Sequence, residues 1–191
     1  GHNGEGTRRG STEGKGAGPV HSGKLHSIFM HFPGLRVCAP MTPQEYKEAW
    51  EEFMKNDNPM IVCEHRCSFD HKDEMRDRLR KNAQITIYAI SAARFNALRA
   101  REILEKQGIK CNIVHIMWLK PFHLTDRLLK PLRQTKIGLV VDSGFEMAGA
   151  SQSIAYSLMW QTGFSVKALG LFDCSAGVTA ETENLTPDAI E

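Results

Sequence analysis

The chain has 191 residues, and its 24 lysines and arginines nearly balance its 22 aspartates and glutamates, for a formal net charge of +2. This length suits one domain plus a piece of another, and it is too short for two full-sized α/β domains. The basic residues are scattered rather than gathered in one stretch, so we expect no nucleic-acid partner. No apolar run approaches the roughly 18 to 20 residues of a membrane helix, so we expect no membrane span.

Five cysteines occur in the chain, and their odd number argues against a disulfide framework. Three of them, Cys38, Cys63 and Cys111, lie in apolar runs of the kind that form buried strands. Free thiols are typical of a reducing compartment, so we predict a cytoplasmic protein or, where a targeting peptide has been cleaved from a longer precursor, a protein of an organelle matrix.

The N-terminal part of the chain is rich in glycine and charge. Residues 1–23 hold 8 of the 16 glycines, a composition that cannot bury enough apolar surface for a core, so we predict a flexible lead-in. Apolar residues then recur at helical spacing from Leu25 to Phe32, which predicts a short helix that ends at Pro33-Gly34.

A strand–helix–strand unit follows. The apolar run at residues 35–39 predicts a strand. Residues 42–45, Thr-Pro-Gln-Glu, supply a capping threonine, a proline at the first helical position and a capping-box glutamate, so we predict a helix from there to Phe53. Residues 60–63 predict a second strand. Because two strands leave sheet edges and faces exposed, we expect a preceding segment or another chain to complete this unit.

Residues 65–83 are densely charged and lack an apolar period, which is typical of an interdomain linker. Beyond them the pattern predicts strands at 85–90, 111–118, 137–142 and 166–172, and helices at 92–107, 124–133 and 148–161. Strands that alternate with such helices predict an α/β fold with an open, mostly parallel sheet and helices on both faces.

Composition and pattern divide the chain into four parts. We expect a flexible glycine-rich lead-in at 1–23, an incomplete α/β portion at 24–66, a linker at 67–83 and an α/β domain at 84–191. Only the last part has the size of a complete domain.

Residues 18–43 carry several short motifs at fixed spacing. They are Gly-Pro-x-His-Ser at 18–22, His-x-Pro-Gly-Leu at 31–35 and Pro-x-Thr-Pro at 40–43. This stretch resembles the end of the pyrimidine-binding domain in the thiamine-diphosphate-dependent transketolase superfamily. Within that superfamily it is most similar to the beta subunit of the pyruvate and branched-chain 2-oxoacid dehydrogenases.

The resemblance extends over nearly all of the chain from Gly18 onward. Residues 58–64 are similar to the family's Asn-Pro-hydrophobic-Glu strand, and residues 114–121 to its hydrophobic run followed by Lys-Pro. It implies that 24–66 is the end of a pyrimidine-binding domain and that 84–191 is the transketolase C-terminal domain. The chain departs from the family because the family's pyrimidine domain begins well before Gly1.

The resemblance implies an enzyme that cleaves a carbon–carbon bond in, or decarboxylates, a 2-oxoacid or ketose, with acyl or ketol transfer. The implied cofactors are thiamine diphosphate and Mg²⁺. The family's diphosphate and magnesium signature, Gly-Asp-Gly followed by Asn, is absent from this sequence, so we expect a partner chain or a missing N-terminal segment to bind them.

The implied assembly is a homodimer or an alpha/beta heterotetramer, with the acyltransferase core of a multienzyme complex as a further partner. The substrate would be a small 2-oxoacid or a sugar phosphate. Two alternatives remain: a non-catalytic module that docks a partner subunit, and an enzyme similar to deoxyxylulose-phosphate synthase.

His21 is the candidate catalytic residue. A loop histidine has a pKa near neutrality and can both give and take a proton, yet on residues alone a lone histidine is more often a surface residue. The resemblance places His21 beside the reactive end of the cofactor and so favours an active-site role.

Four metal-ligating side chains lie within nine residues, namely Cys63, His65, Cys67 and His71. Their spacing matches no standard zinc pattern, and one of the cysteines belongs to a buried strand, so we predict no metal site here.

Three other segments place polar residues at predicted strand ends. We interpret Glu64 as a solvated carboxylate and Asp142-Ser143-Gly144 as a turn. Asp173-Cys174-Ser175 lacks both an elbow motif and a partner histidine, so we predict no nucleophile there.

Overall fold

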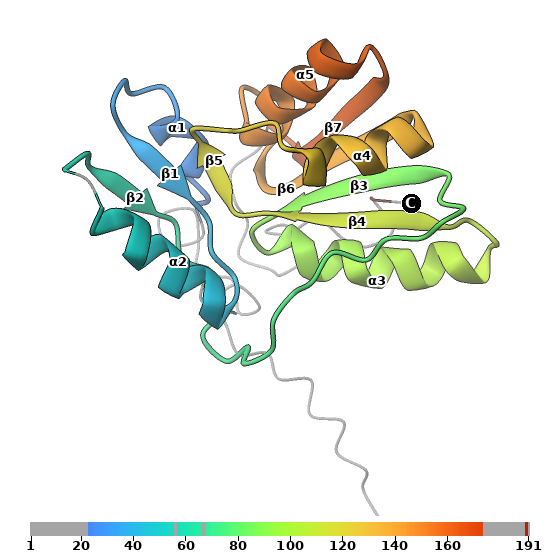
Figure 1. The fold of residues 1–191 in the computed structure, drawn as a ribbon, viewed down its shortest axis with the longest axis horizontal. Helices are drawn as coiled ribbons and strands as arrows, with labels where there is room; N and C mark the ends of the chain where they lie inside the picture. Colours follow the sequence, from blue (N-terminus) through green and yellow to red (C-terminus); the bar gives the residue numbers. More distant parts are fainter. Residues whose placement is uncertain (1–22, 56, 66–67, 174–189, 191) are drawn as a thin grey trace, which may run out of the picture.

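The computed structural model describes residues 23–55, 57–65, 68–173 and 190. These residues form a three-stranded and a four-stranded sheet, which lie next to each other with helices packed around them (Figure 1). None of the described helices is long and apolar enough to cross a membrane.

The larger sheet has the order β4-β3-β6-β7, and all its strands run parallel. Its strands are β3 (Ile85–Ile90), β4 (Cys111–Ile116), β6 (Ile137–Phe145) and β7 (Ser165–Leu171). The helices around it are α3 (Ala93–Lys106), α4 (Asp126–Thr135) and α5 (Ala150–Thr162). The predicted open, parallel α/β sheet is confirmed.

Helices cover both faces of this sheet, as Figure 1 shows. One face packs against α3 through three fully buried alanines, Ala93, Ala97 and Ala100, whose small side chains let the helix approach closely. The other face packs against α4 and α5, which contribute leucine and isoleucine side chains to the larger core. Parallel strands that are covered on both faces are apolar throughout, which explains why the sequence pattern located them well.

The smaller sheet has the order β2-β1-β5. Its first two strands, β1 (Arg36–Cys38) and β2 (Met60–Val62), are parallel and belong to the predicted incomplete portion. Its third strand, β5 (Trp118–Lys120), comes from far downstream and lies antiparallel to β1. The first portion therefore gains a strand from the same chain.

This arrangement corrects the prediction of one strand over residues 111–118. That run is divided at Met117, because Cys111–Ile116 pairs with β3 whereas Trp118–Lys120 crosses to β1. Pairing with the open edge of β1 satisfies backbone groups that two strands alone would leave unpaired.

The start of α2 (Pro43–Phe53) has the predicted capping threonine, whereas the Glu45 side chain bonds to the residue before the N-cap and not to the N-cap itself. Thr42 Oγ1 accepts a hydrogen bond from the Glu45 backbone N–H at 3.4 Å, and the Glu45 carboxylate accepts one from the Met41 N–H at 2.9 Å. Both bonds satisfy N–H groups that have no partner within the helix.

The charged segment before β3 covers the outer edge of the larger sheet. Arg78 and Ile113 exchange two backbone hydrogen bonds of 2.8 Å in an antiparallel bridge. On either side, the Asp77 carboxylate accepts from the His115 N–H at 2.9 Å, and Asn112 Oδ1 accepts from the Arg80 N–H at 2.7 Å. The segment thus protects the edge of β4, which would otherwise be open to another strand.

An ion pair with a fully buried arginine joins α2 of the first portion to α3 of the larger domain. The Arg94 side chain of α3 is 0% exposed and donates from Nη1 to both carboxylate oxygens of Glu45 on α2, at 2.7 Å each. Its Nη2 donates to the Ile116 carbonyl at the end of β4. Burial lowers the pKa of Arg94, and the charge of Glu45 opposes that effect. The Glu45 carboxylate therefore compensates the buried positive charge of the Arg94 guanidinium.

Glu45→Gln tests this compensation. Removing one charge of a buried pair leaves the other uncompensated, so we expect the free energy of unfolding, measured in urea, to fall by about 3 kcal/mol. The control is Glu51→Gln on the same helix, where the carboxylate is 52% exposed and lies 3.8 Å from Lys47. We expect the control to change stability by less than about 0.5 kcal/mol. Equal effects of the two substitutions would contradict the assignment.

Candidate functional site

The carboxyl ends of parallel strands are where α/β sheets usually bind ligands. At the carboxyl end of β6, the short helix α1 (His26–Phe29) packs against the larger sheet. The contact is a hydrogen bond of 2.7 Å between His26 Nε2 and Asp142 Oδ2, and the two side chains are 4% and 0% exposed. The first portion of the chain thus contacts the larger sheet at the carboxyl end of β6.

Asp142, Ser143 and Gly144 lie within β6, so the predicted turn there is wrong. The register of β6 against β7 shifts between Val141 and Phe145, as in a β-bulge, and bulges re-aim side chains at strand ends. Within this irregular stretch, the Gly144 N–H donates a hydrogen bond to Asp142 Oδ1 at 3.1 Å. One carboxylate oxygen of Asp142 therefore accepts a hydrogen bond from the backbone, and the other is hydrogen-bonded to His26.

Glycine at position 144 makes room for the histidine ring. A Cβ built there would lie 3.1 Å from both Cε1 and Nε2 of His26, which is tighter than ordinary van der Waals contact. Burial by itself lowers the pKa of His26, but the charge of Asp142 and the hydrogen bond to it outweigh that effect, so the pKa is raised. The charge of Lys24 opposes them weakly.

Cys63 lies close to the same carboxylate. Burial, and then the charge of Asp142, raise the pKa of the Cys63 thiol to about 11. The thiol is therefore protonated near neutral pH, which makes it a poor nucleophile and a poor metal ligand.

A cavity of about 260 Å³ lies on the outer side of α1, between this helix and the segment that leads from β6 to α5. Large apolar side chains at its rim are 51–66% exposed, namely Leu25, Ile28, Phe32 and Met147. Ser27 Oγ accepts a hydrogen bond from the Ala150 N–H at 2.9 Å and so ties α1 to the start of α5.

His21, the predicted catalytic residue, lies outside the described residues. It comes two positions before Gly23, the first described residue, and five positions before His26. Its catalytic role therefore stays a prediction.

The sequence predicts no metal site at Cys63, His65, Cys67 and His71. The structure describes only part of this set, because Cys67 lies outside the described residues. Among the described residues, no three His, Cys, Asp or Glu side chains are grouped as a metal site. His71 instead packs edge-on against the Phe95 ring, with ring centroids 5.2 Å apart.

Glu64 is exposed, as predicted for a solvated carboxylate. Asp173 is also exposed, whereas the two residues after it lie outside the description.

Among the described residues, no three His, Cys, Asp or Glu side chains are grouped as they would be in a metal centre built by the protein alone. Magnesium needs only one or two protein carboxylates when phosphate oxygens and water supply its other ligands, so this leaves its ligands unassigned. The family's diphosphate signature is absent from the whole sequence. We therefore assign no described residue to that group.

A second cavity, of about 430 Å³, lies between α2, the end of β4 and the start of α4. One of its lining residues, His115, is 2% exposed, and neither ring nitrogen makes a hydrogen bond of ordinary geometry within the described residues. Burial lowers the pKa of His115 to about 3, helped by the charges of Arg94, Arg127 and Arg78 and offset only in part by the Arg76 backbone. This histidine stays neutral and is no proton carrier near pH 7.

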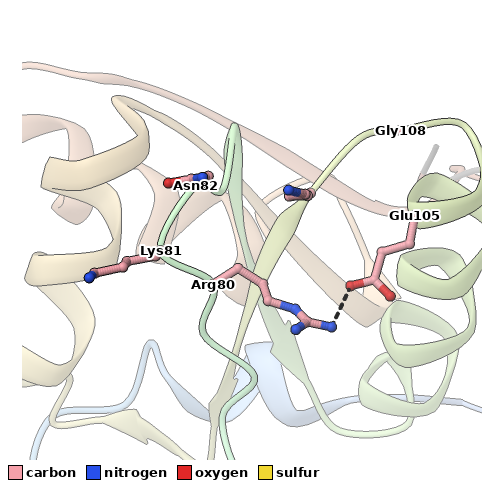
Figure 2. Close-up of a pocket in the computed structure, with 6 residues that line it drawn as sticks. Arg80, Lys81, Asn82, Glu105 and Gly108 are labelled. Carbon is pink, nitrogen blue, oxygen red and sulfur yellow. Dashed lines mark hydrogen bonds and ion pairs between the residues drawn. The ribbon is translucent and has the colours of Figure 1, made fainter.

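A third cavity, of about 350 Å³, lies at the other end of the larger sheet, next to the amino ends of β3 and β4 (Figure 2). Arg80, Lys81 and Asn82 line it from the segment before β3, and Arg80 pairs with Glu105 of α3 at 3.2 Å. Because this is the amino end of the parallel strands, the cavity is the weaker candidate for a ligand site.

Two family models match the chain. The model described as "Transketolase, C-terminal domain" matches residues 76–190, and the one described as "Transketolase, pyrimidine binding domain" matches residues 6–70. The two models follow each other along the chain with a short gap, at the charged segment before β3.

Several curated proteins are similar to the chain. One is the pyruvate dehydrogenase E1 component subunit beta of Rickettsia felis, at 27% identity over 150 residues, which cover 73% of this chain and 46% of that protein. Another is the acetoin:2,6-dichlorophenolindophenol oxidoreductase subunit beta of Cupriavidus necator, at 28% identity over 165 residues, 80% of this chain and 48% of that protein. The chain therefore spans less than half the length of these relatives.

Solved structures share the fold at lower identity. A transketolase from Campylobacter jejuni superposes with a TM-score of 0.70 at 18% identity, covering 94% of this chain and 29% of that one. A structure described as "Split gene transketolase, inactive beta4 tetramer" gives a TM-score of 0.69 at 21% identity, covering 86% and 57%.

His115→Leu tests the buried neutral histidine. The pKa of His115 is lower in the folded state than in the unfolded state. Between pH 6.5 and about 3 the histidine is therefore protonated in the unfolded state and neutral in the folded state. As a result, the free energy of unfolding falls as the pH falls through this range. We expect the variant to be spared this loss, which amounts to about 2–3 kcal/mol at pH 4.5 relative to pH 7.5 in urea unfolding. His123→Leu, at an exposed histidine, is the control and should follow the parent protein. Parallel pH profiles for parent and His115→Leu would refute the prediction.

Proposed function

We propose a function for this chain from the premise that it belongs to the transketolase family, whose C-terminal domain model matches residues 76–190. We infer that it is a beta-subunit-like part of a thiamine-diphosphate-dependent enzyme. Its reaction would cleave a carbon–carbon bond in a 2-oxoacid or ketose and transfer the acyl or ketol group. The supporting observation is that both named relatives, a pyruvate dehydrogenase component and an acetoin oxidoreductase, are beta subunits.

The division of labour in this proposal follows from what the residues offer. When bound, thiamine diphosphate would supply the electron sink for the bond cleavage. Because the family's diphosphate and magnesium signature is absent from the sequence, the ligands for both groups would come from a partner chain or from a preceding segment. This chain would contribute His21 as a proton donor and acceptor next to the reacting group.

The proposed domain division follows the same lines. Residues 24–66 would be the end of a pyrimidine-binding domain, 67–83 a linker and 84–191 the C-terminal domain. The matches that end at residue 70 and begin at residue 76 support this division. The working assembly would be a homodimer or an alpha/beta heterotetramer.

A second candidate function is a non-catalytic assembly module. One observation favours it: a solved structure with this fold is described as an inactive beta4 tetramer. In that case the chain would dock partner subunits, and His21 would have no part in turnover.

His21→Ala separates the two functions. The chain is reconstituted with the protein that supplies the diphosphate site and is assayed with pyruvate, branched-chain 2-oxoacids and acetoin, using a dye as electron acceptor. Loss of a general acid–base catalyst typically costs 10²–10⁴-fold, so we expect kcat to fall by at least about 10²-fold.

The matched control is His123→Ala, because this histidine is exposed and lies far along the chain from His21. Its turnover should stay within about twofold of the parent, as expected of a surface substitution. Unchanged turnover in His21→Ala would favour the assembly function.

A further inference from the structure

We propose that the amino end of the larger sheet is a docking surface for an acidic peptide segment of a partner protein. It lies at the other end of the strands from the His26–Asp142 contact and does not depend on the proposed function. Six cations surround the ends of α3 and α4 and the beginnings of β3, β4 and β6, and we call them the basic surface: Arg80, Lys81, Lys106, Lys110, Arg133 and Lys136.

The fold brings these cations together from segments that are far apart in the sequence. Gln134 Nε2 of α4 donates to the backbone carbonyls of Arg80 and Lys81, at 2.9 and 2.7 Å. The Lys110 N–H donates to Gln84 Oε1 at 2.9 Å, and the Lys110 carbonyl accepts from the Gln84 N–H at 2.7 Å. The segment before β3 is therefore fixed both to the end of α4 and to the start of β4.

Carboxylates balance only part of this positive charge. Among the described residues that line the cavity at this end, Glu105 is the one acid, and it is shared between Arg80 at 3.2 Å and Arg101 at 2.7 Å. Of the six cations, only Arg80 forms an ion pair within the part of the chain that the structure describes. The others are exposed to solvent, so the basic surface carries an excess of positive charge.

The helix ends account for some of these cations and not for others. Lys106 and Arg133 lie in the last turns of α3 and α4, where a positive charge is favourable next to the last carbonyls. Lys81 and Lys110 lie outside the helices and line the cavity of about 350 Å³. Figure 2 shows that the Lys81 side chain points away from Glu105. These two lysines are therefore available to the carboxylates of a partner.

Size and polarity favour a short acidic peptide as the occupant. Helices on opposite faces of a sheet lie on the order of 20 Å apart, and an extended peptide covers about 3.3 Å per residue, so about six residues would span the basic surface. None of the described residues that line the cavity is aromatic, so a nucleic-acid base would find no ring to stack on there. The net charge of the whole chain is only +2, which gives little long-range attraction for a nucleic acid. Glutamate and aspartate side chains would instead pair locally with the exposed cations.

Fluorescence anisotropy with a labelled peptide of eight glutamates tests the docking surface. The full chain is titrated into the peptide at about 50 mM NaCl, and we expect saturable binding. A matched peptide of eight glutamines should not bind. Because exposed ion pairs are screened by salt, the affinity for the glutamate peptide should fall at least about tenfold at about 300 mM NaCl.

Lys81→Gln combined with Lys110→Gln locates the binding on the chain. The double variant removes two charges and keeps the backbone hydrogen bonds of both residues. An exposed ion pair typically contributes about two- to threefold in affinity, so we expect the double variant to bind about fivefold more weakly. The two single variants give the same comparison should the double variant fail to fold.

The matched control combines Lys47→Gln with Lys55→Gln, at lysines that are 67% and 64% exposed in and just after α2. It makes the same change in net charge away from the basic surface, so its affinity should stay within about 1.5-fold of the parent. Equal weakening in the control and in the variant of the basic surface would overturn the proposal, as would the absence of saturable binding at about 50 mM NaCl.

Two competitors test the identity of the occupant. A single strand of nine thymidylates carries eight phosphates, and we expect it to bind more weakly than the glutamate peptide. Tighter binding of this strand would overturn the proposal and assign the basic surface to nucleic acid. Displacement of the peptide by an equal concentration of citrate would also overturn it, since the surface would then be a site for a small anion.

Discussion

A buried charge must keep its partner, and this constraint determines how the two parts of the chain assemble. Glu45 pairs with Arg94, and His26 pairs with Asp142. In each pair one member comes from the portion before the charged segment and the other from the domain after it. Because an unpaired buried charge typically costs about 3–5 kcal/mol, an arrangement that satisfies both pairs is favoured over one that breaks either of them. The strand that crosses from the larger sheet to β1 fits within the same arrangement.

The sequence predicted the larger sheet well because its strands are buried on both faces and so appear as apolar runs between glycine-containing turns. It failed where the apolar run continued from Ile116 through Leu119, since nothing in the local pattern marks a change of sheet. That change depends on an open edge at β1, some eighty residues earlier in the chain, as the paired residues Cys38 and Trp118 show. A pattern read over a short window contains no information about such a distant partner.

For the candidate site, His21 was predicted from the resemblance that the motifs in residues 18–43 carry, and its role stays a prediction. The family that these motifs resemble is the one that the family models match. Asp142-Ser143-Gly144 was misjudged because its composition is that of a turn. Its actual role arises from a bulge in β6 and from a histidine 116 positions away. His115 was missed since a single histidine inside an apolar strand carries no local sign of its buried, neutral state.

Under the proposed function, this chain supplies one side of a thiamine-diphosphate site, and a partner chain or a preceding segment binds the diphosphate and magnesium. This division of the site is tested most directly by calorimetric titration of thiamine diphosphate with Mg²⁺ into the purified chain, alone and after assembly with the protein that carries the diphosphate signature. The account predicts no saturable binding by the chain alone and saturable binding by the assembly. Tight, magnesium-dependent binding to the chain alone would contradict it.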